Sequence, residues 1–193
     1  MATGDITTVA AVEAWGKIPS GSGDALIATL ISAASAWITS FCERSFAGVV
    51  SVTEIRHGNG KSEMNLAESP IASITSLQIG NVVVPAQVGL ANPGYFLIPS
   101  NGPLGATRLA MVGYRFERGT TNVFVTYTAG WSSVPLEIVQ ACNELVVSAY
   151  RRGTNGPDQK SLTVNGQTTA WNLVDMPPVA LAILEKYRKV IAL

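Results

Sequence analysis

Apolar residues recur at helical spacing in four stretches of the chain, which predicts four helices. The first is short and covers residues 6–16, with Thr7 or Thr8 as its N-cap and Gly16 at its end. We expect its apolar side to consist of Val9, Val12 and Trp15.

The second predicted helix runs from about residue 24 to residue 44 and is the most apolar part of the chain. Its expected core face is one stripe of mostly large side chains: Leu26, Ile27, Leu30, Ile31, Ala34, Trp37, Ile38 and Phe41. Another face carries only small residues, namely Ala28, Ser32, Ser35 and Thr39. Small side chains allow a second helix to approach closely. A solvated Ser/Thr face is the alternative, and the pattern leaves both open.

The third and fourth helices lie in the second half of the chain. A β-rich run ends at Gly130-Trp131, and Pro135 begins the third helix because proline is favoured in a first helical turn. Gly153 is expected to leave this helix in a left-handed conformation. The last helix begins at Pro177-Pro178, and its apolar stripe continues to Ile191.

Between the second and third helices the apolar period changes from that of a helix to that of a strand. Glycine and proline interrupt this region repeatedly, so its elements are short and antiparallel pairing is expected. The predicted strands are residues 50–55, 63–66, 74–79, 82–84, 95–98, 107–111 and 122–127.

Between the last two helices, two short β-prone runs flank Asn165-Gly166, a sequence typical of a two-residue hairpin turn. This predicts an extended arm, with an ordinary surface loop as the alternative. The fold class is therefore α+β: a small bundle of about four helices with an inserted antiparallel β unit and a C-terminal arm. We expect one domain over residues 1–193, divided as follows: helical core 6–46, 133–153 and 177–193, β insertion 47–130, and arm 154–176.

Charged residues make up only 13% of the chain, and the formal net charge is zero. Average proteins contain about 25% charged residues. Two explanations stay open: a surface covered by partners, or an uncharged surface that is still solvated. A protein that grips DNA by its phosphates normally carries a basic excess, which is missing here. A basic face offset by an acidic one remains an alternative.

Candidate chemistry is sparse, so we expect no catalytic residue, no metal site and no cofactor. The single histidine, His57, excludes a two-histidine metal site and is interpreted as a polar residue at a hairpin tip. Cys42 and Cys142 are interpreted as buried apolar side chains. Serines and threonines interrupt the apolar residues between 26 and 41, and no signal peptide is recognisable, so we expect no membrane partner.

Several local motifs, in this order, resemble the head-to-tail connector or head completion adaptor proteins of long-tailed double-stranded DNA phages and prophages. The closest match is the strand-to-helix joint at residues 125–142, Val-Thr-Tyr-Thr-Ala-Gly-Trp followed by Val134-Pro135 and Gln140-Ala141-Cys142. The other matching segments are Ile6-Thr7-Thr8-Val9, Asp24-Ala25-Leu26-Ile27, Ala33 to Ile38, Phe41 to Phe46, Pro70 to Leu77, Pro177-Pro178 and Tyr187-Arg188-Lys189.

The resemblance implies a structural protein that is not an enzyme. Such adaptors form a ring, commonly of twelve copies, beneath the portal at the capsid vertex, and they present a surface to the next neck or tail protein. DNA passes through the ring without specific binding. The implied location is the virion neck, after synthesis in the bacterial cytoplasm.

Candidate contact residues follow from this implied role. The subunit interface is expected at Ala28, Ser32, Ser35 and Thr39. Docking to the portal or to a neighbouring copy is expected at Trp171, Lys186, Arg188 and Lys189. Two alternatives stay open: a small ligand-binding or enzymatic α+β domain, and another tail or capsid structural protein.

Overall fold

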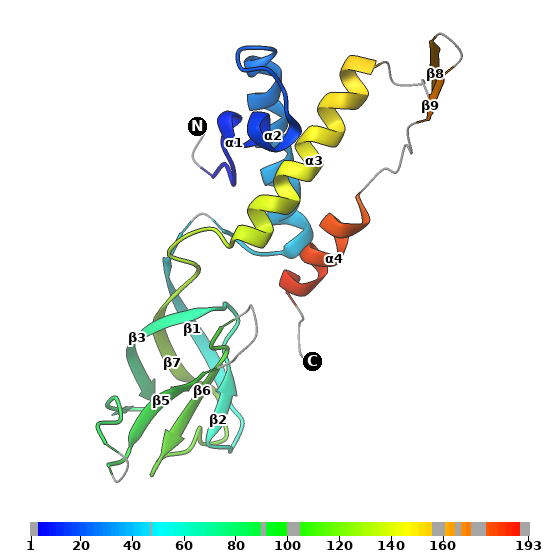
Figure 1. The fold of residues 1–193 in the computed structure, drawn as a ribbon. Helices are drawn as coiled ribbons and strands as arrows, with labels where there is room; N and C mark the ends of the chain where they lie inside the picture. Colours follow the sequence, from blue (N-terminus) through cyan, green and yellow to red (C-terminus); the bar gives the residue numbers. More distant parts are fainter. Residues whose placement is uncertain are drawn as a thin grey trace. The chain divides into compact units, whose positions relative to one another are not determined.

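The computed structural model describes residues 4–46, 48–89, 92–99, 105–155, 161–164, 167–170 and 177–189. The chain divides into two compact units, one made of Met1–Ala47 with Val134–Leu193 and the other of Gly48–Ser133. The first is helical and carries one hairpin, and the second consists of strands (Figure 1). The predicted α+β class is confirmed.

In the described part of the helical unit, four helices form the core. They are α1 (Val9–Gly16), α2 (Asp24–Cys42), α3 (Leu136–Asn155) and α4 (Pro178–Tyr187). Helix α3 contacts the other three, and α2 also packs against α1 and α4. Their buried side chains include Val12, Ile27, Ile31, Ile38, Ile138, Val146 and Leu184.

The helix ends follow local sequence signals at some positions and tertiary contacts at others. Thr8 is the N-cap of α1, since its hydroxyl accepts a hydrogen bond from the backbone N–H of Ala11 at 3.1 Å. Helix α3 passes through Gly153 to Asn155, so the predicted exit at this glycine is wrong.

The predicted continuation of the last helix to Ile191 is also wrong, because α4 ends at Tyr187. Arg188 has an extended backbone, with φ −61° and ψ 138°. The next N–H, that of Lys189, then donates to the carbonyl oxygen of Cys42 at 3.0 Å. The chain therefore leaves its helix to satisfy a carbonyl at the end of α2.

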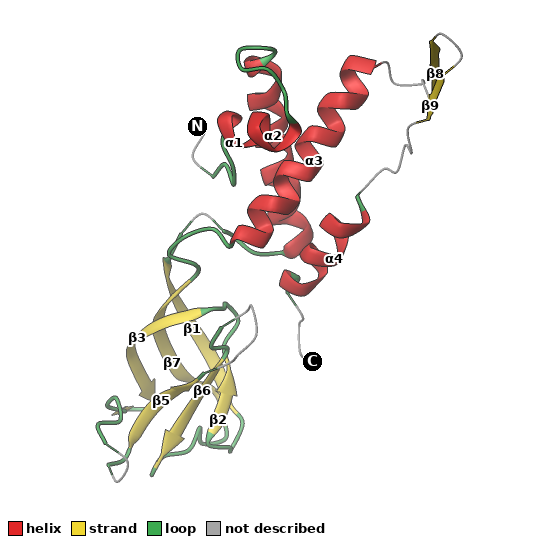
Figure 2. Cartoon of the chain, in the orientation of Figure 1, coloured by secondary structure: helices red, strands yellow, loops and turns green. Residues whose placement is uncertain are grey.

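The described residues of the β unit form seven antiparallel strands in two sheets, which Figure 2 shows as arrows. Their bounds are β1 (Val50–Gly58), β2 (Glu63–Asn65), β3 (Ile71–Ile79), β4 (Val82–Val83), β5 (Gly94–Ile98), β6 (Arg108–Val112) and β7 (Gly119–Ala129). The sheet orders are β1-β7-β3-β4 and β2-β6-β5. Strand β7 thus lies between β1 and β3, two strands that precede it by many residues. Every strand predicted in this region is present.

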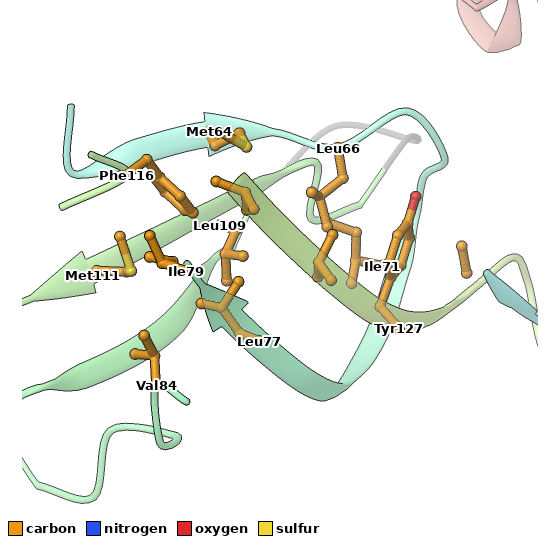
Figure 3. Close-up of a cluster of buried hydrophobic side chains, with 13 residues drawn as sticks. Met64, Leu66, Ile71, Leu77, Ile79, Val84, Leu109, Met111, Phe116 and Tyr127 are labelled. Atoms are coloured by element: carbon orange, nitrogen blue, oxygen red, sulfur yellow. The ribbon is translucent and has the colours of Figure 1, made fainter. Parts of the chain in front are cut away.

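Inward-pointing side chains of both sheets form one apolar cluster, which Figure 3 shows around Leu77 and Leu109. Strand β7 contributes alternate residues to it: Val123, Val125, Tyr127 and Ala129. The Tyr127 hydroxyl donates to the Glu54 carboxylate and accepts from the backbone N–H of Glu68 at 3.0 Å. Burial, with the Glu54 hydrogen bond as a second cause, raises the pKa of Tyr127.

The predicted hairpin between the last two helices is present as β8 (Ser161–Val164) and β9 (Gln167–Ala170). The two strands pair antiparallel from Ser161↔Ala170 to Val164↔Gln167. Their two-residue connection and Trp171 lie outside the described residues.

Candidate functional site

Helix α2 carries the candidate interface residues and has an unusual composition. From Ala25 to Cys42 it contains no charged side chain. By length and composition it is the one helix among the described residues that is apolar enough to cross a membrane, yet only 28% of its apolar window is buried in the protein. A helix that is apolar on all sides is normally covered on all sides. Most of α2 is therefore a surface without charge.

The buried face of α2 differs from the predicted stripe. It consists of Ile27, Ile31, Ser35, Ile38 and Cys42. Leu26 and Trp37, which we predicted to be core residues, are 47% and 42% exposed. Successive helical residues are rotated by about 100°, which places both of them about 80–100° to one side of Ile27. The other helices cover the face of α2 that carries Ile27, Ile31 and Ile38. They leave the side with Leu26 and Trp37 exposed.

The four predicted small residues do not share one exposed face. Ala28 and Ser32 are exposed and Thr39 is half-buried, but Ser35 is only 3% exposed. The Ser35 hydroxyl accepts a hydrogen bond from the backbone N–H of Ile6 at 3.0 Å and lies 4.0 Å from the Cys142 sulfur. The placement of Ser35 on an exposed face is therefore corrected: its side chain is bound within the subunit.

A groove of about 580 Å³ runs along this small-residue side of α2. It is bounded by the segment before α1, by α2 and by the segment after α2. Its lining includes Ile6 and Phe46 as apolar groups and several hydroxyls, among them Ser32 and Thr39. The carboxylate of Asp5 accepts a hydrogen bond from the Ser32 hydroxyl at 3.0 Å. We call this feature the hydroxyl groove.

The other side of α2 carries large apolar residues and a cation. The rings of Trp37 and Phe41 stack with their centroids 5.1 Å apart. The Arg188 guanidinium lies 5.7 Å from the centroid of the Phe41 ring, a cation–π contact that joins the end of α4 to α2. We call Leu26, Leu30, Trp37 and Phe41 the apolar flank.

The other basic docking candidates lie with Arg188 at the C-terminal end of α4. Lys186, in the last turn of α4, and Arg188 are exposed, while Lys189 is half-buried. Trp171 was the fourth docking candidate and lies outside the described residues. The three described candidates therefore share one end of the helical unit.

The described residues offer no cluster for metal binding. They contain no group of three or more histidine, cysteine, aspartate or glutamate side chains arranged to hold a metal ion. A groove of about 710 Å³ in the β unit is lined by a mixture of apolar and polar residues, among them Met111, Arg115 and Glu117. His57 lies within β1 rather than at a hairpin tip, and its Nδ1 accepts a hydrogen bond from the backbone N–H of Thr121 at 2.9 Å.

Both cysteines are buried free thiols, as predicted. Burial raises the pKa of Cys42 to about 11, with the charges of Arg44 and Arg188 opposing the shift. Burial also raises the pKa of Cys142 to about 11, against the lowering effect of the hydrogen bond between Cys142 and Ser35. At neutral pH both groups are protonated and unsuited to nucleophilic chemistry.

The sequence pattern of the family described as "Head completion protein" matches residues 5–190. The chain belongs to this family. The resemblance inferred from the sequence is confirmed, and so is a structural rather than an enzymatic role. No curated protein matches the chain.

Solved structures with a similar fold include the following two. The first, described as "Neck of empty GTA particle computed with C6 symmetry", has a TM-score of 0.54 at 20% identity, covering 100% of this chain and 95% of the other. The second, "Neck of native GTA particle computed with C12 symmetry", has a TM-score of 0.51 at 21% identity, with coverage of 100% and 98%. At this level of identity the similarity establishes the fold of this head completion protein.

Leu26 and Trp37 are surface residues that the sequence pattern assigned to the core, and Trp15, expected on the apolar side of the first helix, is also exposed. A signal for Leu26 and Trp37 existed, because the predicted core stripe was wide and the remaining faces of α2 carried no charge to mark a solvent side.

Proposed function

We propose that this head completion protein is the adaptor of a phage-like neck. In this proposal its copies form a ring, of about twelve, that joins the capsid portal to the next neck or tail protein and extends the DNA channel. The observation that carries the proposal is the family match over residues 5–190. The folds of two neck proteins from particles computed with C6 and C12 symmetry support a cyclic arrangement.

The surface of α2 supports self-association. Large apolar side chains such as Leu26 and Trp37, exposed on a helix side without charge, are typical of an interaction site. Ala28, Ser32 and Thr39 remain candidates for the contact between neighbouring copies. Ser35 contributes indirectly, by holding the wall of the hydroxyl groove through Ile6.

The charge balance supports passage of DNA without tight binding. The formal net charge of the chain is zero, whereas proteins that neutralise many phosphates carry a basic excess. The exposed cations Lys186 and Arg188 lie together at the end of α4. We assign them, with Lys189 and Trp171, to docking on the portal or on a neighbouring copy.

Electron microscopy of the full-length protein, alone and mixed with purified portal, tests the proposal. Closed rings, or an added ring of density on the portal, support it. A protein that forms no ring and adds no density to the portal contradicts it. Because assembly can require the portal as a template, the mixture is the deciding sample.

A further inference from the structure

Helix α2 presents a different set of uncharged side chains on each of its two sides. The apolar flank is centred on Leu26 and Trp37, and the hydroxyl groove includes Ser32 and Thr39. At about 100° per residue, Trp37 and Thr39 are about 200° apart around the helix axis. One helix thus presents an apolar surface to one side and a groove lined by hydroxyl and apolar groups to nearly the opposite side.

The apolar flank is organised for contact before any partner arrives. Trp37 is 42% exposed, and its ring is held by stacking on Phe41. The Phe41 ring in turn lies beneath the Arg188 guanidinium. A tryptophan that is already fixed loses little entropy on binding, and tryptophan and arginine are enriched among residues that dominate interface energies.

The hydroxyl groove has the size and chemistry to receive such a side chain. Its volume of about 580 Å³ lies in the range of sites that enclose a ligand larger than an indole ring. Ile6 and Phe46 offer apolar contacts, and the hydroxyls of the lining offer acceptors for an indole N–H.

The two surfaces are also complementary in charge. Asp5 is the one charged residue in the described lining of the groove. Arg188, the cation at the apolar flank, is exposed. An arginine placed opposite a carboxylate favours one register of docking over others.

We propose that the apolar flank of one copy packs into the hydroxyl groove of the next copy, with Trp37 as the anchor and Arg188 facing the neighbour's Asp5. This proposal rests on the ring of the proposed function and names its contact. Because the two surfaces differ and lie on opposite sides of α2, the contact is heterologous and repeats from copy to copy, which a closed ring requires. A contact between two apolar flanks would instead stop at a twofold dimer.

Two variants that each remove one surface test the contact. Trp37→Glu places a charge on the apolar flank and leaves the groove intact. Ser32→Trp fills the groove and leaves the flank intact. Trp15→Glu is the matched control, because Trp15 is exposed to a similar degree, 50%, and lies on α1 outside both surfaces. Circular dichroism and thermal unfolding of every variant verify the fold.

We expect Trp37→Glu and Ser32→Trp each to lower ring formation, with or without portal, by about 30-fold in affinity, as for a hot-spot side chain. Trp15→Glu should form rings like the unmodified protein. A 1:1 mixture of the two defective variants should form a complex of two copies that grows no further, seen by mass photometry. In it the flank of the Ser32→Trp copy occupies the groove of the Trp37→Glu copy. This result requires both variants to be folded.

Other outcomes overturn the inference. Rings formed by Trp37→Glu as readily as by the unmodified protein would contradict the contact while leaving the adaptor function standing. Dimers of Ser32→Trp alone would indicate a contact between two apolar flanks. Flotation of the unmodified protein with phosphatidylglycerol vesicles, without rings, would assign the flank to lipid. Absence of any ring, with or without portal, would contradict both this contact and the proposed function.

Discussion

Ser35 of α2 accepts a hydrogen bond from the backbone N–H of Ile6 at 3.0 Å, and both residues are buried. Together with the hydrogen bond from Ser32 to Asp5, this contact joins the segment before α1 to the middle of α2. It also supports one wall of the hydroxyl groove, which includes Ile6. A serine that a helical pattern assigns to a polar face is thus a structural residue of the helical unit.

Ser35→Ala should lower the free energy of unfolding by about 1–3 kcal/mol, because the buried N–H of Ile6 loses its acceptor. Urea denaturation followed by circular dichroism measures the change. Ser40→Ala, at an exposed position of the same helix, is the control and should change stability by less than about 0.5 kcal/mol. Equal stability of the two variants would show that the Ser35 contact is unimportant.

Tyr127→Phe should destabilise the β unit by about 1–3 kcal/mol, since the Glu54 carboxylate loses a donor and the Glu68 N–H loses an acceptor. Tyr114→Phe, at a half-buried tyrosine of the same unit, is the comparison. The pH dependence offers a second measurement. Because the folded protein raises the pKa of Tyr127, the stabilisation is complete below the unfolded value of about 10 and declines as pH rises above it. This alkaline loss should be smaller in Tyr127→Phe.

The two buried thiols should react slowly in the folded protein. With pKa values of about 11 rather than 9.0, the thiolate fraction of Cys42 and Cys142 at pH 8 falls by about 100-fold, and burial adds a steric barrier. Iodoacetamide labelling at pH 8 with and without urea, followed by mass spectrometry, measures the difference. The stability contributed by these raised pKa values is complete below pH 9 and is lost as pH rises toward 11. Rapid labelling of both thiols without denaturant would contradict their burial.

Deletion of residues 157–172 tests the arm that contains Trp171. We predict that the arm docks on the portal or on a neighbouring copy, so its removal should weaken portal binding or ring formation. The control replaces the same residues with a flexible Gly/Ser segment of equal length, which preserves the connection to α4. Pull-down with purified portal and electron microscopy report the two activities. If binding and rings survive the deletion unchanged, the arm has no docking role.

Lys186→Glu should weaken portal binding, and the effect should diminish as salt increases, because contacts between exposed charges are screened. Lys61→Glu in the β unit is the control of equal charge change. Titration of portal binding at 50 and 300 mM salt measures both variants. A loss of the same size for Lys61→Glu would point to net charge and not to a docking site at the end of α4.

Much of the fold follows from local pattern. Alternating apolar residues and Gly/Pro punctuation were sufficient to locate the strands of the β unit, and helical spacing located all four helices. The strand order was not accessible in this way. Strand β7 pairs with both β1 and β3, and such distant pairing depends on which side chains fill a common core.

The positions of helix ends were likewise not determined by local sequence pattern alone. A glycine such as Gly153 permits an exit but does not require one, and α3 continues to Asn155. Helix α4 ends before its apolar pattern does, because the Lys189 N–H bonds the carbonyl of Cys42, far away in the sequence.

By itself the sequence determined the α+β class, the position of nearly every element and the family, since these depend on residue spacing and local motifs. Only the tertiary structure decided which side of α2 is buried. Ile27, Leu26 and Trp37 are all apolar, so their pattern cannot tell a core position from an exposed one. The neighbouring helices cover the face of α2 that carries its isoleucines and Ser35. They leave Leu26 and Trp37 on a surface without charge that is suited to another copy of the chain.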